Sequence, residues 1–389
     1  MCGKMASEIW DVVVIGAGII GNCSAYHAAR LGKRTLKLEQ FAFGHERGSS
    51  HGKSRITRYA HVQASWIPIV KDTYVQIEEL EKKRGEKLWS NTGLVWMGSH
   101  SKINELSSTL RSAGCDHEIL NNKEVGERFP LFAGYNSQWL AIFDPKGGAI
   151  KADKWMNAFH EEFLSLGGSF RPNCEVKSIN KGDMVTLHTS QGEIKTKRLI
   201  VAAGNWINKL VPELNVKSTN KLLYKCYWKP LAKEDSELIS VDKMPVFIVY
   251  DQFDGDRGHM AIGDADYPGA VKFMEHGGDE FASGEEPTQS DTICIDRPRT
   301  HLAKYLPKID SSKPYKVDRC KYTLSPDHSY LVDYFGDNKN IMLCGMMSGT
   351  GFKVAPALGR IVAEMVIGKE SPFDVSFFGA SRFEKPFKC

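Results

Sequence analysis

The chain has 389 residues, of which 42% are apolar and 25% charged, and its net charge is +4. This composition is that of a globular protein of about two domains, and the scattered lysines and arginines argue against nucleic-acid binding. No apolar run approaches the roughly eighteen residues that cross a bilayer, and the nine cysteines lack the spacing of a zinc site or a disulfide framework, so we expect no metal, no membrane partner and a reducing compartment.

Residues 10–40 predict a strand, a helix and a second strand. Val12–Ile15 is a buried β-branched run, Ile20 and Ala28 belong to one stripe at helical spacing, and Gly32 closes the helix. The three segments together have the length of a βαβ unit.

The first turn of this unit carries Gly16, Gly18 and Gly21 in a GxGxxG pattern. The first glycine permits the tight turn, the second lets a pyrophosphate approach the backbone, and the third lets helix and strand pack closely. The free N–H groups at the helix start then bind the phosphates. Glu39 ends the second strand, where a carboxylate binds ribose hydroxyls and repels the 2′-phosphate of NADP. The pattern predicts a dinucleotide site and leaves NAD and FAD open.

The rest of the chain alternates helices with strand-rich stretches. In chain order we expect a helix at 67–84, a mostly irregular stretch at 88–149 with a short strand at 92–98, a helix at 151–168, a β-meander at 175–196, an apolar strand at 198–204, strands from 221 to 272, and a last strand, glycine turn and helix within 340–368.

The apolar strand that ends at Gly204 returns after a β-meander, which is similar to FAD domains of the glutathione-reductase type and favours FAD. We therefore predict an α/β (α+β) two-domain fold, with a Rossmann FAD-binding domain interleaved with a mixed β-sheet substrate domain. The FAD-binding domain is expected at 8–90, 150–215 and 315–389, and the substrate domain at 91–149 and 216–314.

Soon after Glu39 the chain gathers positive charge in GSSHGKSRITR, residues 48–58, which we call the charged loop. A solvated surface loop is the ordinary explanation. However, the loop follows the dinucleotide unit and is expected near the far end of the cofactor. Cations there stabilise the negative charge of a reduced flavin.

The sequence resembles the monomeric sarcosine oxidase family, which includes sarcosine, pipecolate and N-methyltryptophan oxidases. The resemblance covers nearly the whole chain. It rests on five motifs in order: VVVIGAGIIG with Glu39, the charged loop, KFMEH at 272–276, RCKYTLSPD at 319–327 and GTGFKVAP at 349–356.

The resemblance implies roles for individual residues. Arg58 and Lys353 match the pair that holds the substrate carboxylate, and a guanidinium with an ammonium makes a sensible carboxylate clamp. Lys272 matches the lysine that activates oxygen over the flavin, and His276 matches a histidine on the substrate side.

The resemblance also implies which residues bind the flavin. Cys320 matches the cysteine that is linked covalently to the flavin 8α-methyl group; a buried structural cysteine is the alternative. His51 and Arg55 match residues beside the flavin ring and are expected among the catalytic residues. The other expected cofactor contacts are Gly16, Gly18, Gly21, Glu39, Ser50, Ser54, Gly204, Gly349, Thr350 and Gly351.

Two positions depart from the family pattern. Ile262 precedes Gly263 near the place where an aromatic YG pair is usual, which makes the pocket less polar and puts sarcosine itself in doubt. Thr350 stands where a histidine usually approaches the flavin, which can alter the redox potential or the reaction with oxygen.

We therefore expect an FAD-dependent oxidase of a small secondary amino acid, such as sarcosine or L-pipecolate, which yields an imine and H2O2. A flavin dehydrogenase with a protein acceptor and a catalytically silent flavoprotein are the alternatives. We expect a monomer. Its compartment is expected to be the peroxisome or the cytoplasm, because the C-terminal tripeptide is a poor peroxisomal signal.

Overall fold

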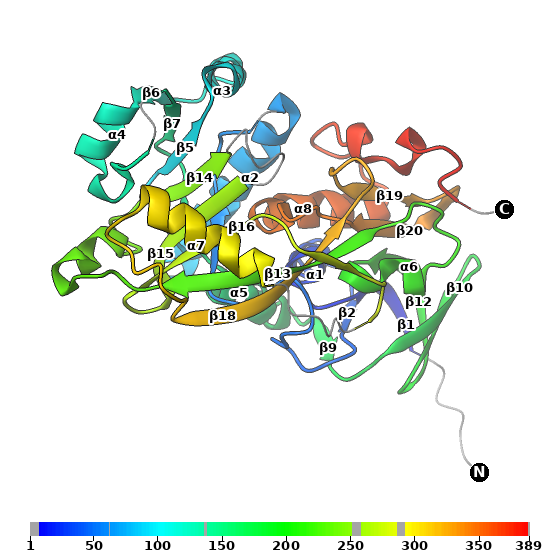
Figure 1. The fold of residues 1–389 in the computed structure, drawn as a ribbon. Coiled ribbons are helices and arrows are strands. Elements are labelled where there is room, and N and C mark those ends of the chain that lie inside the picture. Colours follow the sequence, from blue (N-terminus) through cyan, green and yellow to red (C-terminus); the bar gives the residue numbers. More distant parts are fainter. Residues whose placement is uncertain (1–7, 62, 136–137, 251–257, 286–291, 388–389) are drawn as a thin grey trace, which may run out of the picture.

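Two large sheets, one in each of two lobes, organise the chain in the computed structural model (Figure 1), which describes residues 8–61, 63–135, 138–250, 258–285 and 292–387. The first lobe holds both ends of the described chain, the eight-stranded sheet and most of the long helices. The second lobe holds the nine-stranded sheet. The C-terminal residues 388 and 389, on which the prediction of compartment depends, lie outside the described residues.

The eight-stranded sheet is built around five parallel strands. In spatial order these are β9 (Ser169–Arg171), β2 (Thr35–Leu38), β1 (Ile9–Ile15), β12 (Gly192–Val201) and β20 (Asn338–Gly345). The antiparallel strands β10 (Val176–Lys181) and β11 (Val185–Thr189) extend it beyond β12, and β19 (Leu331–Phe335) pairs with β20. The predicted βαβ unit and β-meander are confirmed.

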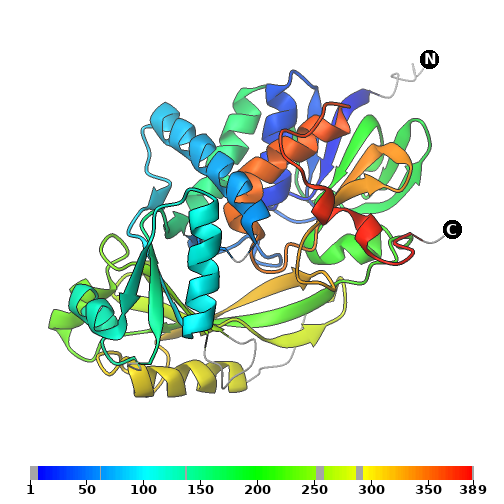
Figure 2. The same cartoon turned by 90° about the horizontal axis from the view of Figure 1, so that it is seen from above.

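Long helices cover one face of this sheet. They are α1 (Ile19–Arg30), α2 (Ile67–Arg84), α5 (Ala152–Ser165) and α8 (Ala355–Val366), which lie side by side in Figure 2. The apolar stripes of these helices bury Val70, Phe159 and Leu358 in one core with Val12 and Val14 of β1. The second half of β1, Val12–Ile15, is a continuous buried apolar run, as expected for a parallel strand in the interior of a sheet.

The nine-stranded sheet forms the second lobe. Its strands run β17 (Asp279–Phe281), β13 (Thr219–Trp228), β16 (Ala270–Glu275), β15 (Gly258–Tyr267), β14 (Val246–Tyr250), β5 (Leu94–Gly98), β7 (Leu140–Asp144) and β6 (Glu118–Asn121), and β18 (Lys316–Leu324) also pairs with β13. A small third sheet joins β3 (Ser54–Thr57), β8 (Gly148–Lys151) and β4 (Trp89–Ser90).

The two-domain α/β fold is confirmed, but the stretch from 88 to 149 is more regular than predicted. It contains α3 (His100–Ser112) and α4 (Asn122–Arg128). A further helix, α7 (Ile293–Tyr305), comes later in the chain and packs on the nine-stranded sheet. The proposed domain boundaries stay a prediction. Just after the last of them, β18 is hydrogen-bonded along its whole length to β13, in the sheet of the second lobe.

Candidate functional site

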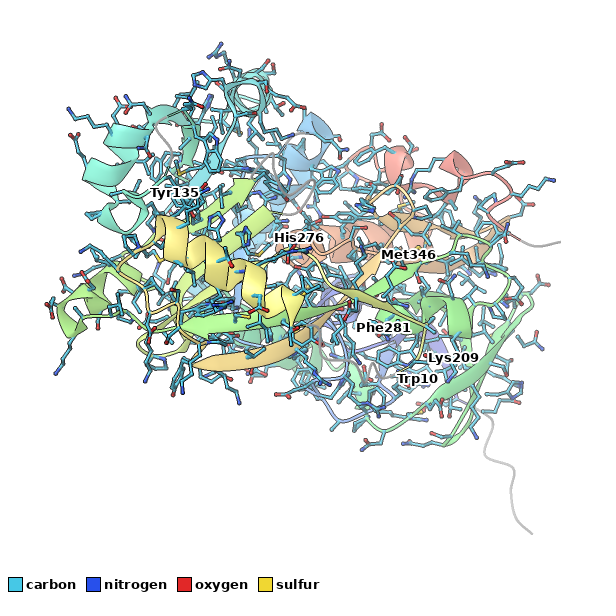
Figure 3. The ribbon with its side chains drawn as sticks, in the orientation of Figure 1. Trp10, Tyr135, Lys209, His276, Phe281 and Met346 are labelled. Atoms are coloured by element: carbon cyan, nitrogen blue, oxygen red, sulfur yellow. The ribbon has the colours of Figure 1, made fainter. Side chains whose placement is uncertain are left out.

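A cavity of about 490 Å³ follows the carboxyl ends of the parallel strands in the first lobe. Its wall includes Ile15, Leu38, Val176, Ala202 and Gly345, which lie at the ends of strands or next to them. Ligands of open α/β sheets bind at this edge. At the other end the cavity reaches the charged loop, β18 and the last glycine turn, near the centre of the molecule, where Figure 3 shows Met346 and His276.

The glycine turn after β1 leaves no room for side chains. A Cβ on Gly16 would lie 2.4 Å from the Ala202 carbonyl oxygen, and one on Gly21 would lie 1.9 Å from the Gly16 oxygen. Gly16 also has a φ of +100°, which favours glycine. Backbone atoms therefore come so close to these two positions that only glycine fits, which explains the structural roles predicted for them.

Glu39 and Ser50 connect this turn to its surroundings. The Glu39 carboxylate accepts hydrogen bonds from the backbone N–H groups of Ala17, at 2.9 Å, and Phe41, at 3.1 Å, and it lines the cavity. The Ser50 hydroxyl accepts from the N–H of Ile19 at 3.0 Å, at the start of α1. The charged loop is thus attached to the helix N-terminus that would face a pyrophosphate.

His51 and Arg55 lie at the far end of the cavity and line it. Arg55 donates to the backbone oxygens of Ser49, His51 and Ser54, which holds the loop in shape. The His51 ring bonds the Arg319 oxygen at 2.8 Å and therefore connects the loop to β18. The structure brings these two residues together on the cavity wall, and their position beside the flavin ring stays a prediction.

Lys272 is buried in β16 beside a carboxylate that the sequence did not single out. Its ammonium lies 2.7 Å from Asp266 and 2.5 Å from the Ser54 hydroxyl, and the Ser54 hydroxyl donates to Asp266. Burial lowers the pKa of Lys272 to about 8, although Asp266 opposes that shift. Burial opposes ionisation of Asp266 too, but Lys272 holds its pKa below the usual range. Ser54 is thus engaged with this ion pair rather than with the cavity wall.

Arg58, Lys353 and His276 share one electrostatic environment in spite of their distance in the sequence. Lys353 is 3% exposed, and burial together with the charge of Arg58 lowers its pKa well below the usual value. Burial and these same two cations lower the pKa of His276 to about 4, so its imidazole is neutral at neutral pH. Within the described residues neither Arg58 nor Lys353 forms an ion pair with a carboxylate; Arg58 donates to the Ala60 oxygen and Lys353 to the Thr350 oxygen.

His61 also belongs to this environment, and it was not predicted from the sequence. It is 4% exposed, and its Nε2 has no hydrogen-bond partner among the described residues. Burial, Arg58 and Lys353 lower its pKa well below the usual value. Its place three residues after Arg58 was the available signal, but spacing alone does not show that a side chain turns toward a site.

Cys320 lies on β18 opposite Leu223 and is 5% exposed. It belongs to a small apolar cluster with Leu223 and Met274, against which Tyr322 and Met260 pack. Tyr322 lines the cavity, and His51 binds the residue before Cys320. The cysteine is therefore close to the charged loop, but it is not among the wall residues of the cavity, and its linkage to the flavin stays a prediction.

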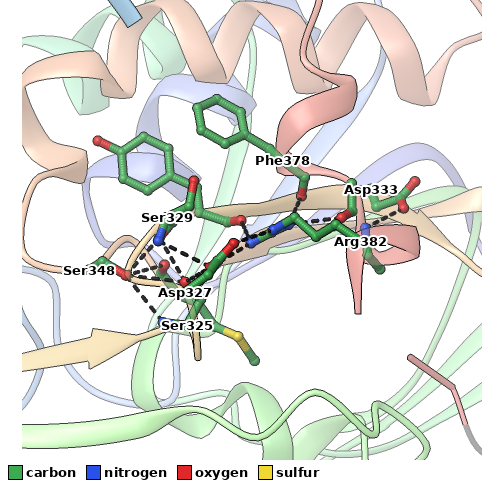
Figure 4. A network of polar contacts seen from close by, with 11 residues as sticks. Ser325, Asp327, Ser329, Asp333, Ser348, Phe378 and Arg382 are labelled. Carbon is green, nitrogen blue, oxygen red and sulfur yellow. Dashed lines mark hydrogen bonds and ion pairs between the residues drawn. The ribbon is translucent and has the colours of Figure 1, made fainter. Parts of the chain in front are cut away.

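The last glycine turn, residues 346–351, is held by a polar network that Figure 4 shows. Ser348 donates to the Ser329 oxygen at 2.6 Å, and Arg382 donates to Asp327 and to the Tyr330 oxygen. The backbone of this turn is strained, since Met346 and Ser348 have φ values of 51° and 44°. The hydrogen bonds hold it in that conformation.

Gly204, Gly349 and Gly351 line the cavity. Thr350 is not among its wall residues, and its hydroxyl shares a 2.8 Å hydrogen bond with Tyr330. Ile262 is buried in an apolar cluster with Trp96 and Ile248 and lies opposite Lys272 in the ladder.

Comparison with known proteins agrees with this geometry. Residues 11–365 match the FAD dependent oxidoreductase family. The chain belongs to this family. A putative sarcosine oxidase of Caenorhabditis elegans is 42% identical over 98% of this chain and 100% of its own length, and the human peroxisomal sarcosine oxidase is 31% identical over 97% of both. The predicted resemblance and the assignment as an oxidoreductase are confirmed.

The fold agrees with a solved structure as well. NikD, an unusual amino acid oxidase essential for nikkomycin biosynthesis, superposes with a TM-score of 0.81 at 21% identity, over 96% of this chain and 98% of that one. The cavity fits FAD: its glycine turn has no room for a Cβ, the Glu39 carboxylate lines the wall after β2, and the Arg55 guanidinium and the His51 ring lie at the far end. Among the described residues no cluster of histidine, cysteine or carboxylate side chains could hold a metal ion, and no helix is long and apolar enough to span a bilayer.

Proposed function

We propose that this FAD-dependent oxidoreductase is an oxidase of a small secondary amino acid, N-alkyl or cyclic, such as sarcosine or L-pipecolate. The observation that carries the proposal is the pair Arg58 and Lys353. These cations lack a carboxylate partner among the described residues and share their surroundings with His276. Lys353 also lies in the short helix Gly351–Val354, whose first two residues line the cavity.

The pair is suited to a carboxylate ligand. Lys353 is buried and Arg58 is partly buried, and their charges repel each other. A carboxylate ligand supplies countercharge to both through charge-assisted hydrogen bonds. Its arrival raises the depressed pKa of Lys353 and favours the ammonium form. The guanidinium of Arg58 fixes the carboxylate plane, and the neutral ring of His276 adds no further charge near the amine.

FAD, when bound, accepts a hydride from the carbon next to the substrate nitrogen and passes the two electrons to oxygen, which gives H2O2 and an imine. The nearby cations favour a neutral substrate amine, so a strong base is not needed. On the other side of the site, the Lys272 ammonium stabilises the negative charge that oxygen acquires with its first electron. Asp266 and Ser54 hold that ammonium in place.

We propose that Cys320 links the flavin covalently. Its thiol would supply the sulfur for a bond to the 8α-methyl carbon; the thiol and the methyl group would each lose a hydrogen, and the two electrons would pass through the flavin to oxygen. Support comes from the position of Cys320 beside Tyr322 and the charged loop. Acid precipitation tests the linkage, because a covalent flavin stays in the pellet and a free flavin passes into the supernatant.

The proposed function is tested by a peroxide assay on the purified yellow protein with sarcosine, other N-methyl amino acids, L-pipecolate and L-proline. Turnover of any of these with one H2O2 per substrate supports the oxidase and ranks the substrates. Rapid reduction by substrate with slow reoxidation by oxygen would favour a dehydrogenase with a protein acceptor. No reduction by any of them would favour a silent flavoprotein.

The proposal includes a monomer in the peroxisome or the cytoplasm. The human relative is named peroxisomal. Imaging of the full-length chain with a fluorescent protein at its N-terminus, which leaves the C-terminus free, separates the two compartments. Light scattering of the holoprotein determines the oligomeric state.

A further inference from the structure

Lys225 is a buried cation of the second lobe that no step above uses. It lies in β13, is 3% exposed, and forms no hydrogen bond or ion pair with any residue the structure describes. In the ladder it stands opposite Asp318, but the Asp318 carboxylate accepts from the Tyr267 hydroxyl at 3.1 Å. Burying an ammonium without a partner is costly, so such a group indicates a ligand with negative charge.

The Lys225 ammonium points at the charged loop. A Cβ on Gly52 would lie 3.0 Å from Lys225 Nζ, 3.7 Å from an Arg55 nitrogen and 3.7 Å from an Asp266 oxygen. Gly52 has a φ of +91° and lines the cavity. The backbone at Gly52 therefore separates the cavity from Lys225 by the thickness of one glycine.

The strand geometry places Lys225 between two residues already assigned to the flavin. Leu223, Lys225 and Tyr227 alternate onto one face of β13. On that face Leu223 stands opposite Cys320 in β18, and Tyr227 stands opposite Lys272 in β16. A ring system linked at Cys320 and facing Lys272 would therefore lie over the position of Lys225.

The local charge balance is positive. Lys225, Lys272 and Arg55 bring three cations against two carboxylates: Asp266, which is paired with Lys272, and Asp318, which lies opposite Lys225 in the ladder and accepts from Tyr267. The charges of Arg55 and Lys225 lower the pKa of Lys272, and that of Lys225 lowers the pKa of His51. The field of Lys225 thus reaches both the loop and the oxygen side of the site.

We propose that Lys225 belongs to the flavin site, where it stabilises the negative charge that the ring system acquires on reduction. This inference rests on the proposed function, because it needs bound FAD. It makes Lys225 a cation that acts on the cofactor across Gly52, distinct from Lys272, whose proposed ligand is oxygen.

Sulfite provides a test without turnover. It adds through sulfur to an oxidised flavin and leaves the ring negatively charged, so its Kd reports how well the protein stabilises that charge. We expect Lys225→Met to raise the sulfite Kd of the holoprotein by about tenfold or more, which corresponds to about 30 mV for a two-electron couple. Lys225→Arg, which keeps the charge, should stay within about threefold of the wild type.

Lys229→Met is the matched control. Lys229 follows β13 by one residue, is exposed, and contacts the Tyr315 ring instead of the charged loop. Its sulfite Kd should be unchanged. If Lys225→Met binds FAD with a wild-type sulfite Kd, the inference is overturned and Lys225 is structural. If Lys225→Met does not retain FAD, the test passes to Lys225→Arg, which keeps the charge. Clearly weakened sulfite binding by Lys225→Arg would then overturn the inference. A wild-type protein without flavin would instead refute the proposed function.

Discussion

At the scale of single residues, the site is organised by the partners that its buried cations have or lack. Lys272 has Asp266 at 2.7 Å, whereas Lys353 and Arg58 have backbone oxygens as hydrogen-bond acceptors. A paired cation keeps its charge and position, and an unpaired buried cation favours an anionic ligand. The difference supports the proposed roles: a fixed electrostatic role for Lys272 and a binding role for the other two.

The binding role leads to a prediction for Arg58. Arg58→Ala removes the charge-assisted interaction with the substrate carboxylate, worth about 1.5–3 kcal/mol in all, so KM should rise by about tenfold to a hundredfold. Steady-state peroxide assays measure the change. The methyl ester of the best substrate serves as the control, because it lacks the carboxylate and should respond little to the substitution. An equal loss with acid and ester would contradict the proposed pose.

The paired role of Lys272 predicts a pH dependence of reoxidation. Its ammonium form stabilises the charge on oxygen, and burial sets its pKa to about 8. The rate constant should therefore be constant below about pH 8 and fall as pH rises through that value. Stopped-flow mixing of the reduced protein with oxygen measures it.

Lys272→Met supplies the comparison for this prediction. The variant should react slowly at every pH and lack the step near pH 8, while Lys229→Met should keep the wild-type profile. A step that persists in Lys272→Met would assign the titration to another group.

At the scale of elements, the two glycine turns position the site, and local signals in the sequence predicted them well. Gly16, Gly21 and Gly349 are constrained by contacts within a few ångströms of the backbone, which a motif encodes directly. The helix α3 was missed although Ile103, Leu106 and Leu110 recur at helical spacing. Asp266 and His61 were missed for a different reason: Asp266 meets Ser54, and His61 comes into the field of Lys353, only in the tertiary fold, which sequence spacing does not show.

The glycine turns allow a matched comparison. Gly16 and Gly192 have nearly the same φ, +100° and +105°, but a Cβ on Gly16 would meet the Ala202 oxygen, whereas nothing lies within 4 Å at Gly192. Gly192→Ala should cost about 1–2 kcal/mol from the backbone conformation alone and keep FAD. Gly16→Ala adds a backbone clash in the cofactor cradle and should lose it.

Absorbance of the purified variants at the flavin band, with circular dichroism as a check on folding, measures this difference. Retention of full flavin content by Gly16→Ala would show that the turn relaxes and that close approach at Ala202 is not needed for binding.

At the scale of the whole molecule, the cavity joins segments that the sequence keeps far apart. The first glycine turn, the end of β12 and the last glycine turn all contribute walls, and β18 brings Cys320 from the sheet of the second lobe. FAD therefore contacts both lobes in the proposed arrangement. A ligand that binds the native state stabilises it by mass action, by about 2.7 kcal/mol at a hundred times its Kd.

Covalent attachment changes how this stabilisation depends on concentration. Once the flavin is linked to Cys320, dilution cannot remove it, so the Tm of the wild-type holoprotein should not change with added FAD. In Cys320→Ser the cofactor dissociates, and Tm should fall on dilution and rise again with excess FAD. Thermal melts at several FAD concentrations measure both responses.

Cys226→Ser is a control at another buried cysteine of the same lobe, and its Tm should be lower but insensitive to FAD. If the wild-type Tm rises with added FAD as that of Cys320→Ser does, the flavin is held without a covalent bond. The stability of the two-lobed molecule then depends on the concentration of free FAD.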